Sequence, residues 1–253
     1  MATTSSLPPG LAAPIPFYVT PYYNSEGPAI NVGPLSEALA LATPATIGVM
    51  AEAWRPALAY QPATTLFVLA VRLFDLGQHD EGLYWFYQAQ YRARLLHRLL
   101  DPTQIGQLFD PAFELESAHG AFLELAGPYF NGYAGCAQAR WLGAIERVRA
   151  DNQEVPNFAL IYPGLALCPA EEWPANQQAI DAGLAGLATA LRAGWDEMQA
   201  ERRANGTHAQ FCGPANSMKA PGALSNSKAG SNICPIWVCS SRRCSSRARY
   251  CAW

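Results

Sequence analysis

The stretch from residue 80 to residue 94 constrains the fold more than any other part of this chain. It places five aromatic residues, two glutamines and two arginines within about four helical turns. Four consecutive aromatic side chains, 84–87, point in all directions around a helix, so neighbouring segments must enclose it on several sides. Acidic residues open the stretch and basic residues close it, which suits the helix dipole. The sequence therefore predicts a buried central helix from about Asp80 to Leu100.

Other segments carry apolar residues at helical spacing and indicate an all-α fold. The clearest pattern runs from Ile180 to Met198, where apolar residues recur every three or four positions. We expect six or seven helices packed irregularly around the buried aromatic helix. The predicted helices are residues 34–40, 45–54, 62–77, 80–100, 104–125 with an interruption at Pro111, 137–150 and 175–203.

Composition divides the chain into three parts. Residues 1–33, rich in Pro, Gly, Ser and Thr, predict an extended N-terminal arm, and residues 34–205 form the predicted helical domain. Residues 206–253 have no helical or strand period, no acidic residue, and five of the seven cysteines. Two explanations stay open for this C-terminal tail: disorder, or sequence not selected with the fold, such as a shifted reading frame, read-through or added residues.

The overall composition limits the classes of function that this chain can have. With 253 residues, half of them apolar and 15% charged, the chain is typical of a globular protein. We expect a cytoplasmic protein, because no run of about eighteen apolar residues predicts a membrane span and Met1–Gly10 lacks the features of a secretory signal. Residues 1–201 hold nine basic and all 20 acidic residues, a net charge of −11, which argues against nucleic-acid binding there.

The cysteine spacing does not predict a metal site or a disulfide framework. No C-x-x-C pair occurs in the chain, whereas structural zinc sites bring cysteines in as close pairs. Cys136 and Cys168 are expected to be small buried side chains, and a disulfide framework would need an oxidising compartment. We expect no metal and no cofactor.

The sequence gives little evidence for the motifs that are typical of enzymes. Glu116 and His119 share one helix face, as ligands do in di-iron bundles, but the chain has one such motif where those bundles use two. His79 beside Asp80 and Glu81 offers a possible general base, although Asp80 is better explained as a capping or first-turn acid. The sequence contains no G-x-S-x-G elbow and no glycine-rich phosphate loop.

The polar residues of the aromatic helix define a candidate ligand or partner cleft. Arg94 and Arg98 are four positions apart and share a face with Gln90 one turn earlier. Enclosed charges need partners, so these side chains either pair internally with acidic residues or line a polar cleft. The candidate cleft comprises Gln90, Arg94, Arg98, Glu116 and His119.

Residues 66–98 resemble one helix–turn–helix unit of the tetratricopeptide or Sel1-like type. Leu73, Leu76 and Gly77 match positions of its first helix, and Ala89 matches a small residue of its second. Asp80 stands where these motifs usually have an aromatic residue. Because no second copy occurs in the chain, the resemblance implies local geometry only.

A longer stretch, about residues 60–203, resembles uncharacterised bacterial proteins. The shared pattern is Asp80-Glu81, Trp85-Phe86-Tyr87, Gln90, Arg92 and Arg94, followed by Gly127-Pro128, Asn131-Gly132-Tyr133-Ala134 and the helix that carries Trp141 and Ile145-Glu146-Arg147-Val148. The resemblance implies a bacterial origin and a common fold unit, and no activity.

Two main hypotheses for function follow, beside a structural role as a peripheral subunit of a larger assembly. The first is a non-enzymatic cytoplasmic protein that binds a protein partner through a helical surface. By analogy with other small acidic helical proteins of bacteria, it could neutralise a toxin or assist a secretion system. The alternative is an enzyme or ligand-binding domain that uses the candidate cleft.

Overall fold

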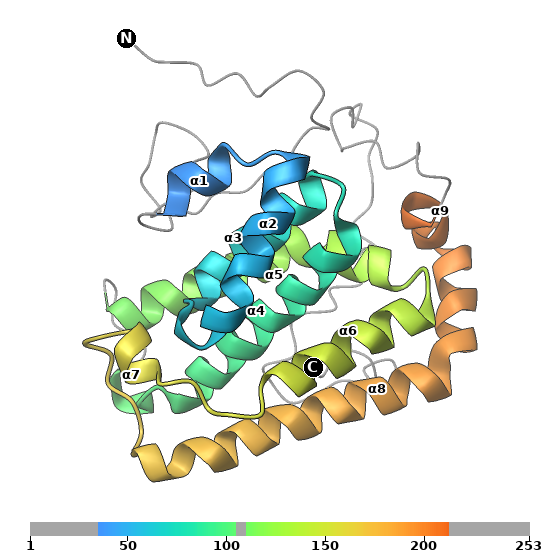
Figure 1. The fold of residues 1–253 in the computed structure, drawn as a ribbon. Helices are drawn as coiled ribbons and strands as arrows, with labels where there is room; N and C mark the ends of the chain where they lie inside the picture. The colour runs from blue at the N-terminus through green and yellow to red at the C-terminus, as the bar shows by residue number, and fades with distance from the viewer. Residues whose placement is uncertain (1–34, 105–109, 213–253) are drawn as a thin grey trace.

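A computed structural model describes residues 35–104 and 110–212; the expected N-terminal arm and tail residues 213–253 lie outside this part. The described part is all-α, without a strand, which confirms the predicted fold class (Figure 1). It contains nine α-helices, two more than the seven predicted segments, because α7 and α9 are too short to show a period in sequence. The α-helices are α1 Ser36–Ala40, α2 Pro44–Trp54, α3 Ala63–Asp75, α4 His79–Leu99, α5 Pro111–Ala134, α6 Gln138–Asp151, α7 Phe158–Ile161, α8 Trp173–Ala204 and α9 Thr207–Phe211.

The α3–α4 hairpin forms the centre of the molecule. Helix α4 is the predicted aromatic helix, and Trp85 and Phe86 are fully buried within it. Gly77 turns the chain between the two helices with φ of 84°, a conformation that disfavours residues with a Cβ. Gly82 lets the helices approach closely, since an added Cβ would lie 3.0 Å from the carbonyl oxygen of Ala70. The prediction of a buried central helix is confirmed.

Helix α5 closes the aromatic core. Phe122 stacks on Phe67 of α3 with ring centroids 4.6 Å apart, and Phe130 stacks on Phe86 at 4.2 Å. The Asp110 carboxylate accepts the Ala112 N–H at 2.8 Å and caps the helix. Pro111 therefore begins this helix, where the sequence analysis placed an interruption, because proline fits the first turn well.

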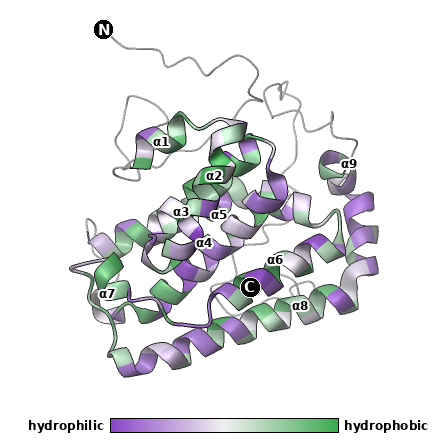
Figure 2. Cartoon of the chain, viewed as in Figure 1, coloured by the Kyte–Doolittle hydropathy of each residue, from purple (hydrophilic) through white to green (hydrophobic). Residues whose placement is uncertain are grey.

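Helices α6 and α8 cover one side of α4. Helix α8 carries both polar and apolar residues along its whole length (Figure 2). It is kinked at Gly194, whose φ and ψ of −109° and 15° are not helical (Figure 1). A buried amide network joins these elements. Gln88 and Asn152 exchange hydrogen bonds of 3.0 and 2.7 Å, and Gln177 donates to the Asn152 carbonyl oxygen at 2.7 Å.

Buried arginines fix the N-terminal helices to the core. Arg72 donates to the carbonyl oxygens of Leu39 and Ala42, just at and after the end of α1. Arg92 donates to the carbonyl oxygens of Leu58 and Ala59 in the 3₁₀ helix Arg55–Tyr60. Cationic donors suit these positions, since the last carbonyls of a helix lack partners within it.

The described chain continues beyond the domain boundary expected at Asn205. Residues 207–211 form α9, and a disulfide joins the next residue, Cys212, to Cys136 between α5 and α6. The disulfide corrects two expectations, that Cys136 is a small buried thiol and that Cys212 belongs to the tail. Their Cα atoms lie 5.3 Å apart although they are 76 positions apart in sequence. Only the folding of the chain brings the two together.

Candidate functional site

Two residues of the candidate cleft pair with side chains outside the predicted set. Glu116 on α5 lies 3.3 Å from the Nδ1 atom of His97, so it does not pair with His119 on its own helix. Arg98 donates to the amide oxygen of Asn176 on α8 at 3.2 Å. Both pairs are at least partly exposed to solvent; one joins α4 to α5 and the other joins α4 to α8.

The other three residues of the candidate cleft are more buried than Glu116 and Arg98. Gln90 is 1% exposed, and neither amide atom of its side chain has a hydrogen-bond partner among the described residues. His119 lies beside the Phe67 ring, and burial lowers its pKa to about 4. Burial also lowers the pKa of Arg94, which is partly exposed, to about 10. That these five side chains line one ligand cleft stays a prediction.

Two other kinds of site are absent from the described ranges. Within residues 35–104 and 110–212, no three His, Cys, Asp or Glu side chains are grouped so that they could hold a metal ion. In the same part of the chain, no helix has the length and apolar character needed to cross a membrane.

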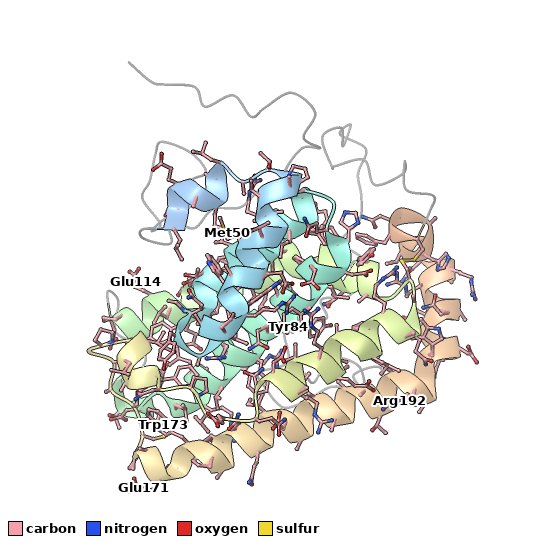
Figure 3. The ribbon with its side chains drawn as sticks, viewed as in Figure 1. Met50, Tyr84, Glu114, Glu171, Trp173 and Arg192 are labelled. Carbon is pink, nitrogen blue, oxygen red and sulfur yellow. A yellow bond between two sulfur atoms is a disulfide. The ribbon has the colours of Figure 1, made fainter. Side chains whose placement is uncertain are left out.

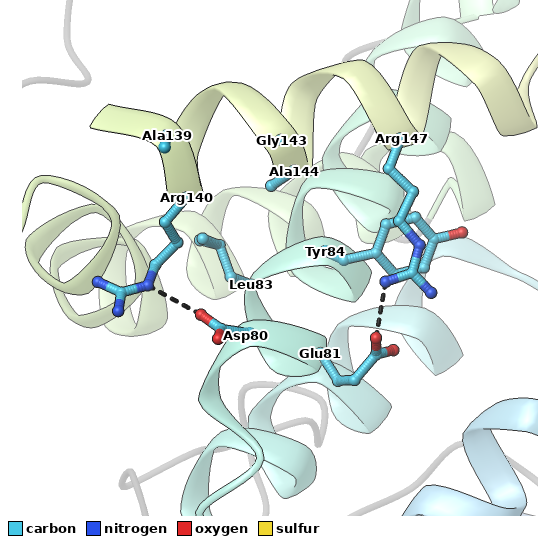
Figure 4. A pocket seen from close by; sticks show the side chains of 9 residues that line it. All are labelled: Asp80, Glu81, Leu83, Tyr84, Ala139, Arg140, Gly143, Ala144 and Arg147. Carbon is cyan, nitrogen blue, oxygen red and sulfur yellow. Dashed lines mark hydrogen bonds and ion pairs between the residues drawn. The ribbon is translucent and has the colours of Figure 1, made fainter. Parts of the chain in front are cut away.

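A charged recess lies between the first turns of α4 and one face of α6 (Figure 4). It has a volume of about 340 Å³ and is open to solvent. Small residues of α6 form part of its wall, which is why the two helices leave space there. The lining residues are Asp80, Glu81, Leu83, Tyr84, Ala139, Arg140, Gly143, Ala144 and Arg147.

Asp80 forms one side of the recess. Its Oδ1 atom accepts a hydrogen bond from Arg140 Nε at 2.8 Å and another from the Tyr133 hydroxyl at 2.9 Å. The Arg140 guanidinium lies over the Tyr133 ring, 4.1 Å from its centroid. The arginine is therefore fixed by an ion pair and a ring contact together.

Glu81 forms the other side and binds two arginines. Arg55 Nη2 lies 2.5 Å from Oε2, and Arg147 Nη1 lies 2.6 Å from Oε1. The same two guanidiniums face the Tyr84 ring, at 5.1 and 3.9 Å from its centroid. Tyr84 itself is buried and lies between α4 and α6 (Figure 3). Two arginines, a carboxylate and an aromatic ring are thereby held in one arrangement.

This arrangement suits binding better than proton transfer. Each carboxylate of the recess already accepts hydrogen bonds from guanidinium groups. The Tyr84 hydroxyl donates to Asp151 at 2.7 Å, and burial followed by this hydrogen bond raises the pKa of Tyr84. A tyrosine with a raised pKa stays protonated near neutral pH and is a poor general base.

His79, the possible general base of the sequence analysis, lies outside the recess lining. Its ring packs 4.5 Å from the Phe74 ring and 5.2 Å from the Tyr133 ring, between centroids. Burial lowers the pKa of His79, which favours its neutral form. Asp80 is a first-turn acid of α4, as expected.

The recess was not predicted from the sequence, although two of its features are visible there. Asp80 and Glu81 are adjacent acids at the start of the predicted aromatic helix. Arg140 and Arg147 are seven positions apart, which places them on one face of a helix. Nothing in the sequence showed that this face would lie opposite the start of α4.

Comparison with known proteins gives one distant relative. Over 131 residues the chain is 30% identical to an uncharacterised protein of Haemophilus influenzae, in an alignment that covers 48% of this chain and 46% of that protein. The chain thus spans about half the length of this relative. No protein-family profile matches the chain. No solved structure matches it. The chain is similar to an uncharacterised bacterial protein, and the tetratricopeptide-like resemblance stays a prediction.

Proposed function

We propose that this chain is a non-enzymatic protein that binds a protein partner at the charged recess between α4 and α6. The arrangement of Arg55, Tyr84 and Arg147 around Glu81 carries the proposal. Arginine is enriched among the residues that dominate binding energy at protein interfaces, and the buried Tyr84 ring orients the two guanidiniums. Here the side chains are held in position before any partner binds, which reduces the entropy lost on association.

The open form of the recess also supports a macromolecular partner. A volume of about 340 Å³ is at the low end for small-molecule pockets, which bury most of their ligand. A side chain or loop of a partner needs only partial enclosure. A role in toxin neutralisation or secretion, in the cytoplasm, is part of this proposal by analogy alone.

Gly143 offers a direct test, because no heavy atom lies within 4 Å of the position that its Cβ would occupy. We expect Gly143→Gln to fill the recess without disturbing the fold, since replacing a helical glycine removes a cost of roughly 0.5–1 kcal/mol. A tagged full-length chain should recover a specific protein from lysate of the native organism, and the variant should lose it.

Gly186→Gln is the matched control, because Gly186 is exposed on α8 and also has open space around its Cβ position. It should bind the partner as the unmodified chain does. Recovery of the same partner by Gly143→Gln would exclude the recess as the binding site, and recovery of no specific protein by the unmodified chain would count against the proposal as a whole.

A ligand-binding domain or enzyme that uses the candidate cleft is the alternative, and the buried Gln90 amide favours it. A buried amide without partners costs free energy, and a ligand with one donor and one acceptor would satisfy it. Thermal-shift screening of small polar metabolites tests this alternative. A stabilising compound whose effect is lost in Gln90→Met, a change of similar size, would support it; an equal shift in the variant would rule out Gln90 as its contact.

A further inference from the structure

Helix α9 is seated on the end of α5 by shape as well as by the disulfide. An added Cβ at Gly132 would lie 2.6 Å from the Phe211 ring, so only glycine leaves room for this side chain. Gln199 on α8 donates to the Gly135 carbonyl oxygen at 2.7 Å and lies 3.3 Å from His208 of α9. The Cys136–Cys212 disulfide therefore belongs to a packed contact between three helices.

Arg202 on α8 lies beside both sulfur atoms of this disulfide. Its Nη2 atom is 3.5 Å from Cys212 Sγ and 4.0 Å from Cys136 Sγ, and it donates to the Gly132 carbonyl oxygen at 2.9 Å. An added Cβ at Gly135 would lie 2.6 Å from the centre of the guanidinium. The surrounding backbone thus leaves a space in which this side chain fits.

The charge of Arg202 has no acidic counterpart in the described part of the chain. No carboxylate of residues 35–104 or 110–212 lies within ion-pair distance, and the buried Nε atom has no hydrogen-bond partner there. Burial lowers the pKa of Arg202, which reflects a cation removed from water without compensation. A thiolate at either sulfur would supply the missing negative charge, and the disulfide has none.

We propose that Cys136 and Cys212 form a redox-active pair that exchanges with low-molecular-weight disulfides, and that Arg202 is the positioning residue that stabilises the Cys212 thiolate. A neighbouring cation favours a thiolate, which is the nucleophile of disulfide exchange. Stabilising the reduced form makes a disulfide easier to reduce. Cys136 and Cys212 are both partly exposed, so small disulfides can reach them.

The exchange balances with glutathione disulfide as the oxidant. The Cys212 thiolate attacks one sulfur, forms a mixed disulfide and releases one glutathione thiolate. Cys136 loses its proton to water, attacks Cys212 Sγ and releases the second glutathione thiolate. Two electrons pass from the protein to glutathione disulfide, and reduced glutathione reverses both steps.

The first test is a redox equilibrium on the full-length chain. The protein is equilibrated with mixtures of reduced and oxidised glutathione, quenched by alkylation, and the Cys136–Cys212 peptide is measured by mass spectrometry. In Arg202→Gln we expect the equilibrium constant for disulfide formation with glutathione to rise about tenfold. The reason is that the Cys212 thiolate loses its counter-charge, which destabilises the reduced form. Arg203→Gln, the same change at the exposed neighbouring position, should leave it unchanged. Equal constants for wild type and Arg202→Gln would overturn the proposal.

A second measurement needs no variant. Cys168 is a free thiol in the same chain, and burial followed by the nearby Glu172 raises its pKa. In the reduced wild-type protein, alkylation near neutral pH should modify Cys212 at least about tenfold faster than Cys168. Faster or equal modification of Cys168 would contradict the assigned role of Arg202. Oxidised protein whose peptide map lacks the Cys136–Cys212 link would contradict the pair itself.

Discussion

At the scale of single residues, this core depends on contacts of individual side chains that the sequence pattern does not predict. The absent side chain of Gly82 sets the distance between α3 and α4. The buried cations Arg72 and Arg92 donate to backbone carbonyl oxygens, and Arg72 also lies 4.0 Å from the Asp75 carboxylate. His119 is a polar side chain in an aromatic layer, 6.1 Å from the Phe67 ring centroid. Gly82 and His119 each lead to a separate prediction about stability.

Gly82→Ala should destabilise the fold. Its Cβ would lie 3.0 Å from the Ala70 carbonyl oxygen and 3.1 Å from the Phe74 amide nitrogen, both of which are backbone atoms. Helices α3 and α4 would have to separate, at a cost of about 1–3 kcal/mol. Urea unfolding of both proteins measures the difference. Gly120→Ala on α5 is the control, because its Cβ position is open and the change should be neutral or stabilising.

His119 should make the protein less stable in acid. Its pKa is lowered from 6.5 to about 4 in the folded state, so the unfolded chain binds the proton more readily. The contribution of neutral His119 to the free energy of unfolding is fully present above the unfolded-state pKa. It is lost as the pH falls from 6.5 toward 4, by up to about 3 kcal/mol. Unfolding free energies measured across this range should fall less steeply in His119→Leu. Parallel curves for the two proteins would show that His119 does not cause the loss.

At the scale of elements, Glu81 joins three segments that are distant in sequence. It binds Arg55, which follows α2, and Arg147 on α6, while it belongs to α4 itself. Periodicity predicted each of these helices separately, because each buries its own apolar stripe. Their mutual orientation depends on pairs such as this one, which form only after the helices have packed.

A double-mutant cycle can measure this connection. Glu81 and Arg147 are 33% and 37% exposed, so their coupling should be about 1 kcal/mol, above that of a fully exposed pair. The cycle uses Glu81→Gln, Arg147→Met and the double variant. Glu146 and Arg192 provide the comparison, at 59% and 52% exposed, with an expected coupling below about 0.5 kcal/mol. Equal couplings in the two cycles would mean that Glu81 does not hold the helices together.

At the scale of the whole molecule, the folded unit includes α9 and Cys212. A composition change near Asn205 suggested an earlier end, because the tail differs from the body in charge and in cysteine content. The contacts of Phe211 with Gly132, and of Cys212 with Cys136, instead join residues 207–212 to the body. A shifted reading frame, one of the two explanations for the tail from residue 206, would have to account for these contacts.

Truncation tests the extent of the unit. A chain that ends after Cys212 should unfold at the same temperature as the full chain under oxidising conditions. A chain that ends after Asn205 loses the disulfide, whose 76-residue separation corresponds to about 4 kcal/mol in the chain-entropy account. Its melting temperature should fall by about 10 °C. A shorter chain that melts with the full one would show that α9 adds nothing to the fold.

The amino-acid sequence by itself determined the all-α class, the burial of the aromatic helix and most helix positions. These properties follow from local spacing, because a side chain's face on a helix depends only on its position along the chain. Tertiary structure alone decided where the recess lies, that Glu116 pairs with His97, and that Cys136 meets Cys212. These contacts join residues far apart in sequence, and no local period records which faces of two helices will meet.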